Sequence, residues 1–202
     1  MPFGHLTRLA GRWKQRGSPY HGLFLPYDGD EVVSLDCETS GLDPKTDAIV
    51  SIGAVKVKGR SIQTGGQLHL MIDHGAHLSA QSIRIHRIRK IDLVAAQSMD
   101  DALEHLLNFI GNRPLLGYNL AFDLKFLNRA LEPRYRFRLP NRAIDLADVY
   151  RRHIVKRQPD AVPHLGLDEI LAELNLPVFG RHTAIGDAMT VAMAYVKLTT
   201  TR

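Results

Sequence analysis

The spacing of hydrophobic positions changes about halfway along the chain. Between residues 31 and 73, two largely apolar runs at 32–37 and 49–57 and an alternating run at 61–73 predict three strands. Glycine, proline and aspartate crowd the segment 41–47 between the first two runs. A turn of this composition favours an antiparallel meander of the three strands.

From residue 100 onward, the apolar positions recur at helical spacing. A first helix is predicted to end at Gly111, a short strand follows at 114–117, and a second helix begins after Asn119, a good N-cap, and ends before Pro133. Further helices are predicted at 146–153, 167–174 and 184–198. Strands first, and then helices alternating with short strands, indicate an α/β fold: a single domain with a mixed β-sheet flanked by α-helices.

The N-terminal residues show neither pattern clearly. Residues 6–15 are compatible with a short helix, but glycines and prolines then punctuate the chain up to residue 26. We therefore expect a loosely structured, basic N-terminal arm at 1–28 and a folded domain at 29–202. No stretch has the apolar length of a signal peptide or of a membrane span.

Composition adds two constraints. The chain has 26 Lys and Arg residues against 21 Asp and Glu, a formal net charge of +5, which favours an anionic partner such as nucleic acid, although many basic proteins bind none. A single cysteine excludes an intramolecular disulfide and a cysteine-rich zinc site. This cysteine usage suits a reducing compartment, so we expect a soluble, cytoplasmic protein with no membrane partner.

Two acids, Asp36 and Glu38, close the first predicted strand. Strand alternation places both carboxylates on one face and Cys37 on the other, with Cα atoms of the two acids roughly 6.6 Å apart. Two like charges this close normally share a cation, and carboxylate ligands suit Mg²⁺ or Mn²⁺. The alternative is an ordinary pair of strand-end acids facing water.

Three further residues are candidates for the same site. Asp123 lies at the edge of the apolar face of the second helix, and Asp187 lies in the first turn of the last helix. His182 precedes Asp187 by five residues, so it shares a site only if it lies on the loop before that helix. A loop histidine suits a mobile general base. Taken singly, Asp123 is equally compatible with a solvated residue and Asp187 with a helix-start acid.

Together these residues form three motifs. Residues 35–44 (Leu-Asp-Cys-Glu-Thr-Ser-Gly-Leu-Asp-Pro) are followed by Ile-Gly-Ala-Val at 52–55, then by Gly-Tyr-Asn-Leu-Ala-Phe-Asp at 117–123 and by His-Thr-Ala-Ile-Gly-Asp-Ala at 182–188. In this order the motifs resemble the DEDDh branch of the DnaQ-like 3′-to-5′ exonucleases, which includes the exonuclease domain of the DNA polymerase III epsilon subunit. The resemblance spans about residues 31–198 and implies a ribonuclease H-like fold.

The resemblance also implies an activity: metal-dependent hydrolysis of phosphodiester bonds at 3′ ends, with release of nucleoside 5′-monophosphates. It assigns Asp36, Glu38, Asp123 and Asp187 to two divalent ions, Mg²⁺ or Mn²⁺, and His182 to the role of general base.

The substrate-binding residues that the resemblance implies are Thr39, Gly41, Leu42, His86 and Asn119. For Gly41 and Leu42 the alternatives are a tight turn and a cap on the core, and for His86 a structural hydrogen bond. The chain departs from the family where His86 is followed by Arg87, because glycine is common there. Asp145 resembles a recurrent acidic position outside the metal set, which we interpret as support for the site or as a helix cap.

Several functions agree with this family. We expect single-stranded DNA or RNA 3′ ends as substrate, with DNA favoured, and a stand-alone repair or RNA-processing enzyme because only a few residues follow the last helix. The alternatives are a proofreading subunit that binds DNA polymerase III or other replication and repair proteins, and an RNA-trimming exoribonuclease. A different class is a catalytically inactive nucleic-acid-binding module.

Overall fold

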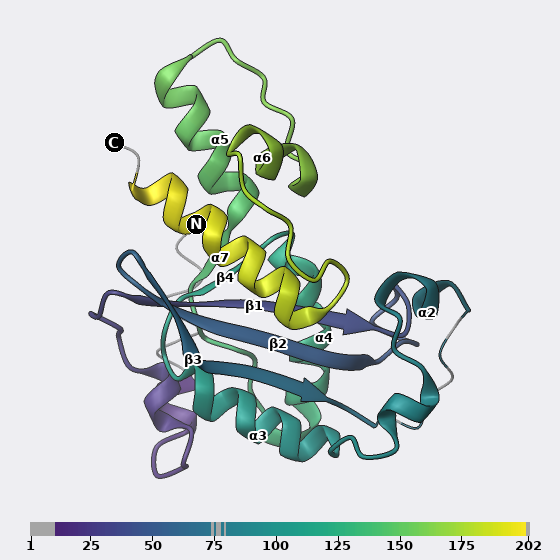
Figure 1. Cartoon of the computed structure of the whole chain (residues 1–202). Helices are drawn as coiled ribbons and strands as arrows, with labels where there is room; N and C mark the ends of the chain where they lie inside the picture. Colours follow the sequence, from purple (N-terminus) through teal and green to yellow (C-terminus); the bar gives the residue numbers. More distant parts are fainter. Residues whose placement is uncertain (1–10, 74, 76–77, 79, 201–202) are drawn as a thin grey trace.

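A computed structural model describes residues 11–73, 75, 78 and 80–200, and it has a mixed five-stranded sheet with helices on both faces (Figure 1). The strands are β1 (Glu31–Thr39), β2 (Ile49–Lys58), β3 (Ser61–Met71), β4 (Leu115–Gly117) and β5 (Ala143–Asp145). The α-helices are α2 (Ala80–His86), α3 (Met99–Ile110), α4 (Leu120–Tyr135), α5 (Leu146–Arg157), α6 (Leu167–Glu173) and α7 (Ala184–Thr200), and two 3₁₀ turns are η1 (His21–Phe24) and η2 (Lys90–Leu93). The predicted fold class is confirmed.

β1 lies at the centre of the sheet, whose strand order is β3-β2-β1-β4-β5. It pairs antiparallel with β2 and parallel with β4, and β2 pairs antiparallel with β3. The predicted meander is therefore confirmed. The short edge strand β5, parallel to β4, was not predicted, because a run of three residues carries no readable alternation.

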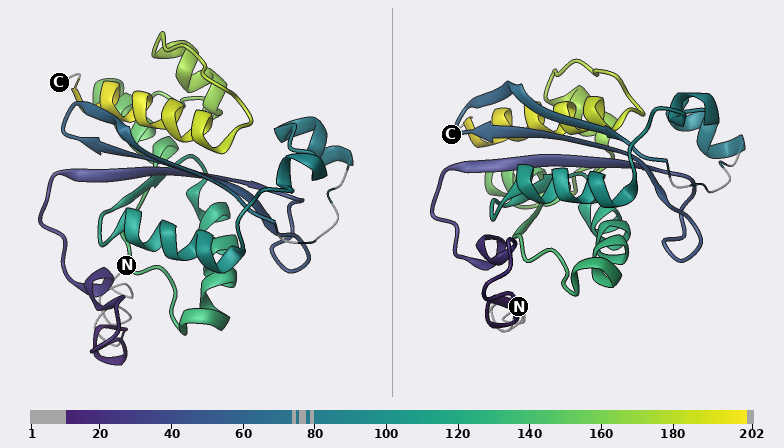
Figure 2. Two further views of the ribbon diagram at one scale, coloured as in Figure 1. Left: turned by 60° about the horizontal axis from the view of Figure 1, so that its bottom comes forward. Right: turned by 90° about the horizontal axis from the view of Figure 1, so that it is seen from below.

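The two faces of the sheet bury different sides of β1. Val33, Leu35 and Cys37 pack in the core with α3 and α4, whereas Val32 packs in the core beneath α5, α6 and α7. Figure 2 shows this separation, with α7 in yellow above the sheet and α3 in teal below it. A side chain therefore faces α7 or α4 according to its position along the strand.

The contact between α7 and the sheet depends on Gly53, which pairs with Asp36 in the β1–β2 register. A Cβ atom at this position would lie 2.2 Å from the carbonyl carbon of Ala184, at the start of α7. Only glycine allows the first turn of α7 to lie so close to the strands. The Ser34 hydroxyl donates to the Ala188 carbonyl at 2.7 Å and holds the next turn of the helix on the sheet.

Two predicted helix ends are wrong. α4 continues through Pro133 to Tyr135, because a proline in the last turn removes one helical hydrogen bond without breaking the helix. The chain leaves the helix at Arg136, whose φ of 59° is left-handed. α5 extends to Arg157, well beyond the predicted end at residue 153.

The prediction of a loosely structured arm is wrong for residues 11–28. Leu23 and Phe24 are buried in the core beneath the sheet, and the Phe24 ring lies 5.4 Å from the Phe137 ring. The Asn112 side-chain amide donates to the carbonyls of residues 25 and 26. Glycine and proline indicated irregular backbone correctly, but aromatic anchors fix it in place. Residues 1–10, with the first part of the predicted helix at 6–15, lie outside the described residues.

Replacing Phe24 by alanine is expected to lower the free energy of unfolding by about 3 kcal/mol, because a buried ring and its aromatic contacts are lost. Urea unfolding followed by circular dichroism measures this change. Trp13→Ala is the matched control, since the Trp13 side chain is 75% exposed and its removal is expected to change little. Equal effects of the two substitutions would contradict the packing of the arm.

Within the described part of the chain, no helix combines the length and the apolar character that a membrane span requires.

Candidate active site

Three carboxylates converge where β1 meets the first turn of α7. Asp36 and Glu38 lie on the α7 face of β1, and one carboxylate oxygen from each, together with one from Asp187, lie within 4.8 Å of one another. Asp36 is partly buried, and Glu38 and Asp187 are buried. The pairing register of β1 with β2 shifts between Glu38 and Thr39.

The donors of this cluster fit a divalent metal ion. Three carboxylates within 4.8 Å, two of them buried and one partly buried, repel one another unless a cation lies between them. Their hard oxygen atoms are the ligands that Mg²⁺ and Mn²⁺ prefer. The two-residue spacing of Asp36 and Glu38 and the close approach at Gly53 bring the cluster together.

Asp123 reaches the end of β1 from the other face of the sheet. It lies in the first turn of α4, is buried, and its Oδ1 accepts a hydrogen bond of 3.0 Å from the backbone N–H of Cys37. It is not one of the three acids that converge within 4.8 Å. Its charge nevertheless contributes to raising the pKa of Asp36, so the four acids belong to one electrostatic group.

Burial and neighbouring negative charges raise the pKa values of three of these acids. The pKa of Glu38 rises to about 7, chiefly through burial and then through the charge of Asp187. Burial also raises the pKa of Asp123 to about 7. The pKa of Asp36 rises well above its ordinary value through burial, helped by Asp123, Glu38 and Asp187. Without a cation, the site therefore retains protons that exposed acids would lose.

This retention predicts that the metal-free protein loses stability as the pH rises. The folded-state pKa of Glu38, about 7, lies above its ordinary value of 4.5, so the folded protein binds the extra proton between these pH values and stability decreases across that window. Glu38 alone contributes on the order of 3 kcal/mol, or roughly 5–10 °C in Tm. Thermal unfolding in EDTA between about pH 5 and pH 8 measures the effect.

Two comparisons test whether the acidic cluster causes this decrease of Tm with pH, which defines the slope of Tm against pH. Adding Mg²⁺ is expected to flatten it, because a bound cation stabilises the ionised carboxylates, and Glu38→Gln is expected to reduce it in EDTA. Glu132→Gln, at an exposed acid of α4, is the matched control and is expected to leave the slope unchanged. A metal-free Tm that does not fall with pH would contradict the raised pKa values.

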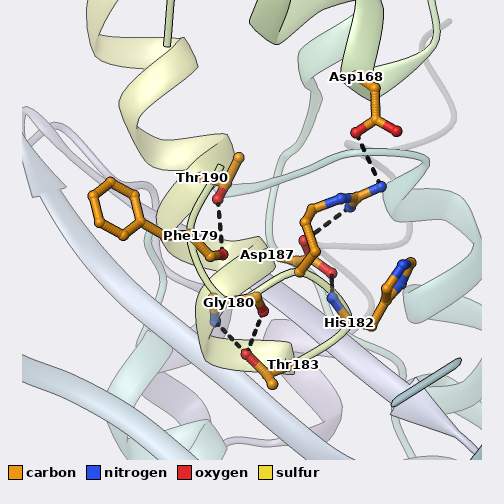
Figure 3. A network of polar contacts seen from close by, with 9 residues as sticks. Asp168, Phe179, Gly180, His182, Thr183, Asp187 and Thr190 are labelled. Atoms are coloured by element: carbon orange, nitrogen blue, oxygen red, sulfur yellow. Dashed lines mark hydrogen bonds and ion pairs between the residues drawn. The ribbon is translucent and has the colours of Figure 1, made fainter. Parts of the chain in front are cut away.

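The loop before α7 forms a network around Asp187 (Figure 3). Arg181 Nη1 donates to Asp187 Oδ1 at 2.9 Å, and the backbone N–H of His182 donates to Asp187 Oδ2 at 3.0 Å. Arg181 Nη2 also pairs with Asp168 Oδ1, in the first turn of α6, at 3.3 Å. Sequence reasoning assigned no role to Arg181, although its position directly before His182 was a signal for one.

His182 lies on the loop before α7, two residues ahead of Ala184. Its backbone adopts a left-handed conformation with φ of 62°, and its side chain is exposed. Among the described residues, the imidazole has no hydrogen-bond partner. The backbone is therefore fixed by Asp187, while the imidazole is free to contact a molecule bound at the cluster.

The turn after Glu38 is tightly constrained. Thr39 Oγ1 donates to the Gly41 carbonyl at 2.6 Å, and a Cβ atom at Gly41 would lie 2.5 Å from the carboxylate of Asp47. A larger residue at position 41 would therefore require the Asp47 side chain to move. Leu42 is 78% exposed, so the alternative that it caps the core is wrong.

His86 is buried at the end of α2 and lies outside the carboxylate cluster. Its Nδ1 accepts the backbone N–H of Ile88 at 3.0 Å, so the structural hydrogen bond of the alternative is present, and burial lowers its pKa. Arg87, at the position where the family commonly has glycine, has a left-handed φ of 61°. The backbone here retains a glycine-like conformation despite the change of residue.

Asn119 occupies the N-cap position of α4, but it makes no side-chain cap. Its side chain is exposed, and its backbone is left-handed, with φ of 52°. Asp145 performs the capping instead: its Oδ2 accepts from Leu120 N at 3.1 Å and its Oδ1 from Ala147 N at 3.0 Å. The helix-capping interpretation of Asp145 is confirmed for two helices.

Two segments rich in basic residues, 84–90 and 134–138, are partly neutralised. In the segment 134–138, Arg134 pairs with Asp100 and Arg138 with Glu132. In the segment 84–90, Arg89 pairs with Asp92. These pairs reduce the local excess of positive charge without removing it.

Comparisons with known proteins agree on one family. The exonuclease family model RNase_T matches residues 33–195. The DNA polymerase III subunit epsilon of Rickettsia felis is 30% identical over 170 residues, which cover 83% of this chain and 73% of that protein. The PolC-type DNA polymerase III of Thermotoga petrophila is 28% identical over 171 residues, 85% of this chain, but the chain spans only 12% of that protein.

A solved structure agrees with the fold. The crystal structure of E. coli exonuclease I in complex with a dT13 oligonucleotide matches 86% of this chain and 41% of that chain, with a TM-score of 0.70 and 18% sequence identity.

Proposed function

The chain belongs to this exonuclease family, in its DnaQ-like group, and on that premise we propose that it hydrolyses single-stranded nucleic acid from the 3′ end in a metal-dependent reaction. The observation that carries the proposal is the convergence of carboxylate oxygens from Asp36, Glu38 and Asp187 within 4.8 Å. Asp123 lies across the end of β1 from them and completes the four acids of the family pattern.

The four acids have a defined task in this proposal. Asp36, Glu38, Asp123 and Asp187 would hold two Mg²⁺ or Mn²⁺ ions, which supply Lewis-acid chemistry at the scissile phosphodiester. The raised pKa values of Asp36, Glu38 and Asp123 are consistent with carboxylates arranged for a cation.

His182 would act as the general base. The attacking water would give its proton to the imidazole as its oxygen bonds to phosphorus, and the bond from phosphorus to the 3′ oxygen of the preceding nucleotide would break. The leaving 3′ oxygen would take up a proton from solvent. The products are a nucleoside 5′-monophosphate and a strand with a free 3′ hydroxyl. The exposed imidazole on a loop fixed by Asp187 supports this role.

The turn at residues 39–42 would receive the terminal nucleotide. The hydrogen bond from Thr39 to the Gly41 carbonyl holds this turn directly after β1, and exposed Leu42 is free to contact the last base. Asn119 and His86 remain proposed substrate contacts: Asn119 is exposed at the start of α4, whereas His86 would need a substrate that reaches its buried edge.

DNA is the favoured substrate. This choice is supported by the relatives named as DNA polymerase III proteins and by the fold shared with an exonuclease I that holds a dT13 oligonucleotide. The alternative is an exoribonuclease that trims RNA. The excess of basic residues agrees with either substrate.

A proofreading role has one specific observation in its favour, the 30% identity to a DNA polymerase III epsilon subunit. In this role the chain would bind a polymerase subunit and remove misincorporated nucleotides. Gel filtration with the purified polymerase subunit of the source organism tests it, since a proofreading subunit elutes as a complex. An inactive binding module is the less favoured class, because such a module has no reason to retain a loop histidine beside four clustered acids.

The deciding experiment uses a 5′-labelled single-stranded DNA oligonucleotide with Mg²⁺ or Mn²⁺, beside an RNA of the same sequence. We expect a ladder that shortens from the 3′ end, stops on addition of EDTA, and forms faster with DNA. No shortening of either strand in the presence of metal would show that the proposed activity is wrong.

A further inference from the structure

Arg181 places a fixed positive charge directly on the carboxylate cluster. Its Nη1 contacts Asp187 Oδ1 at 2.9 Å, and its side chain is only 27% exposed. Asp187 Oδ1 belongs to a carboxylate that the proposed function assigns to a metal. A guanidinium therefore lies where a cation is required.

The charge of Arg181 acts on the other acids of the cluster as well. It lowers the pKa of Glu38 and of Asp36, against burial and the neighbouring carboxylates, which raise them. A cation bound among these acids would meet this guanidinium as a like charge at short range.

The second contact of Arg181 leads away from the cluster. Its Nη2 lies 3.3 Å from Oδ1 of Asp168 on α6, and the Asp168 side chain is 70% exposed (Figure 3). Among the described residues, Asp168 has no other side-chain partner. The guanidinium thus has one partner inside the cluster and one outside it.

We propose that Arg181 is a built-in cation that neutralises the cluster in the metal-free protein, competes with the divalent ion for Asp187, and keeps Asp168 as its partner when the ion binds. The proposal rests on the function proposed above. Because His182 follows Arg181 directly and its N–H donates to the same carboxylate, release of Asp187 by Arg181 couples metal binding to the position of the general base.

Competition and a purely structural role predict opposite changes in metal affinity when Arg181 is removed. If Arg181 only braced the loop and Asp187, its removal would weaken metal binding. If it competes, its removal strengthens metal binding, and removal of Asp168 weakens it, because the guanidinium then has only Asp187 as a partner.

The test measures Mn²⁺ affinity of the full chain without nucleic acid, by titration calorimetry and by the paramagnetic resonance signal of free Mn²⁺. Arg181→Gln is expected to bind Mn²⁺ about tenfold more tightly, and Asp168→Asn about threefold more weakly. The double variant is expected to behave like Arg181→Gln, since Asp168 acts through Arg181. Arg138→Gln, which breaks the exposed pair with Glu132, is the matched control and leaves the affinity unchanged.

One further variant guards against a folding artefact. Arg181→Lys keeps the positive charge, and its Mn²⁺ affinity is expected to lie between those of the wild type and Arg181→Gln. The Asp168 side chain is exposed, so Asp168→Asn is expected to leave the packing of the protein intact. Unchanged or weaker Mn²⁺ binding by Arg181→Gln would overturn the competition, and unchanged binding by Asp168→Asn would overturn the role of Asp168.

The inference on Arg181 and the exonuclease proposal can each fail without the other. Wild-type protein that binds Mn²⁺ but leaves oligonucleotides intact would contradict the exonuclease proposal alone. Wild-type protein that shortens oligonucleotides, with an Arg181→Gln variant that gains no affinity, would contradict the inference on Arg181 alone.

Discussion

Replacing Asp36 by asparagine is expected to lower the rate of 3′-end hydrolysis by about three orders of magnitude, or about 4 kcal/mol of transition-state stabilisation. The same substitution is expected to raise the Tm of the metal-free protein, because it removes a carboxylate whose pKa is raised by burial and by three neighbouring acids. Shortening of a 5′-labelled oligonucleotide and thermal unfolding in EDTA measure the two effects.

The adjacent residue provides the matched control. Cys37 faces the core with α3 and α4, and Cys37→Ala keeps the backbone N–H that donates to Asp123. We expect its hydrolysis rate within about threefold of the wild type and a stability loss of about 1 kcal/mol. If Cys37→Ala and Asp36→Asn abolished hydrolysis equally at unchanged stability, the assignment of faces along β1 would be wrong.

Replacing His182 by alanine is expected to lower the rate of hydrolysis by a factor of about 10²–10⁴, the range for loss of a general base. Mn²⁺ affinity is expected to stay near that of the wild type, because the four carboxylates remain and the backbone N–H at this position still donates to Asp187. Single-turnover rates and Mn²⁺ titrations on the same preparation separate the two effects.

Added imidazole distinguishes a role of His182 as general base from a purely structural role in the loop. The side chain of His182 is exposed, so imidazole in solution has access to the vacated position and is expected to restore part of the activity of His182→Ala. His105→Ala, at an exposed histidine on α3, is the control and is expected to retain the wild-type rate. A His182→Ala variant with the wild-type rate would exclude the imidazole as the base.

Local patterns predicted most elements of the fold. The apolar runs at 32–37 and 49–57 predicted the central strands, because a strand buried on both faces is apolar along most of its length. The turn residues between the two runs predicted the antiparallel meander. Helix ends were less accurate: α4 continues past Pro133, since proline costs little in a last turn. The docking of residues 11–28 was missed because it depends on Phe137 and Asn112, which are distant in sequence.

For the site, the motifs around Asp36, Asp123 and His182 predicted the chemistry through their resemblance to the DnaQ-like exonucleases. They did not predict that Asp145, and not Asn119, caps α4. Asp145 lies 25 positions from Leu120, the residue whose N–H it accepts, and no local rule relates the two.

The sequence by itself determined the fold class, the family, the common face of Asp36 and Glu38 and the loop position of His182, because each depends on side-chain periodicity or on order along the chain. Only the tertiary structure decided that Asp187 joins those two acids while Asp123 approaches from the opposite face. It also decided that Arg181 pairs with both Asp187 and Asp168. Such contacts depend on how closely α7 lies on the strands at Gly53, and close approach between distant segments leaves no periodic signal in a single sequence.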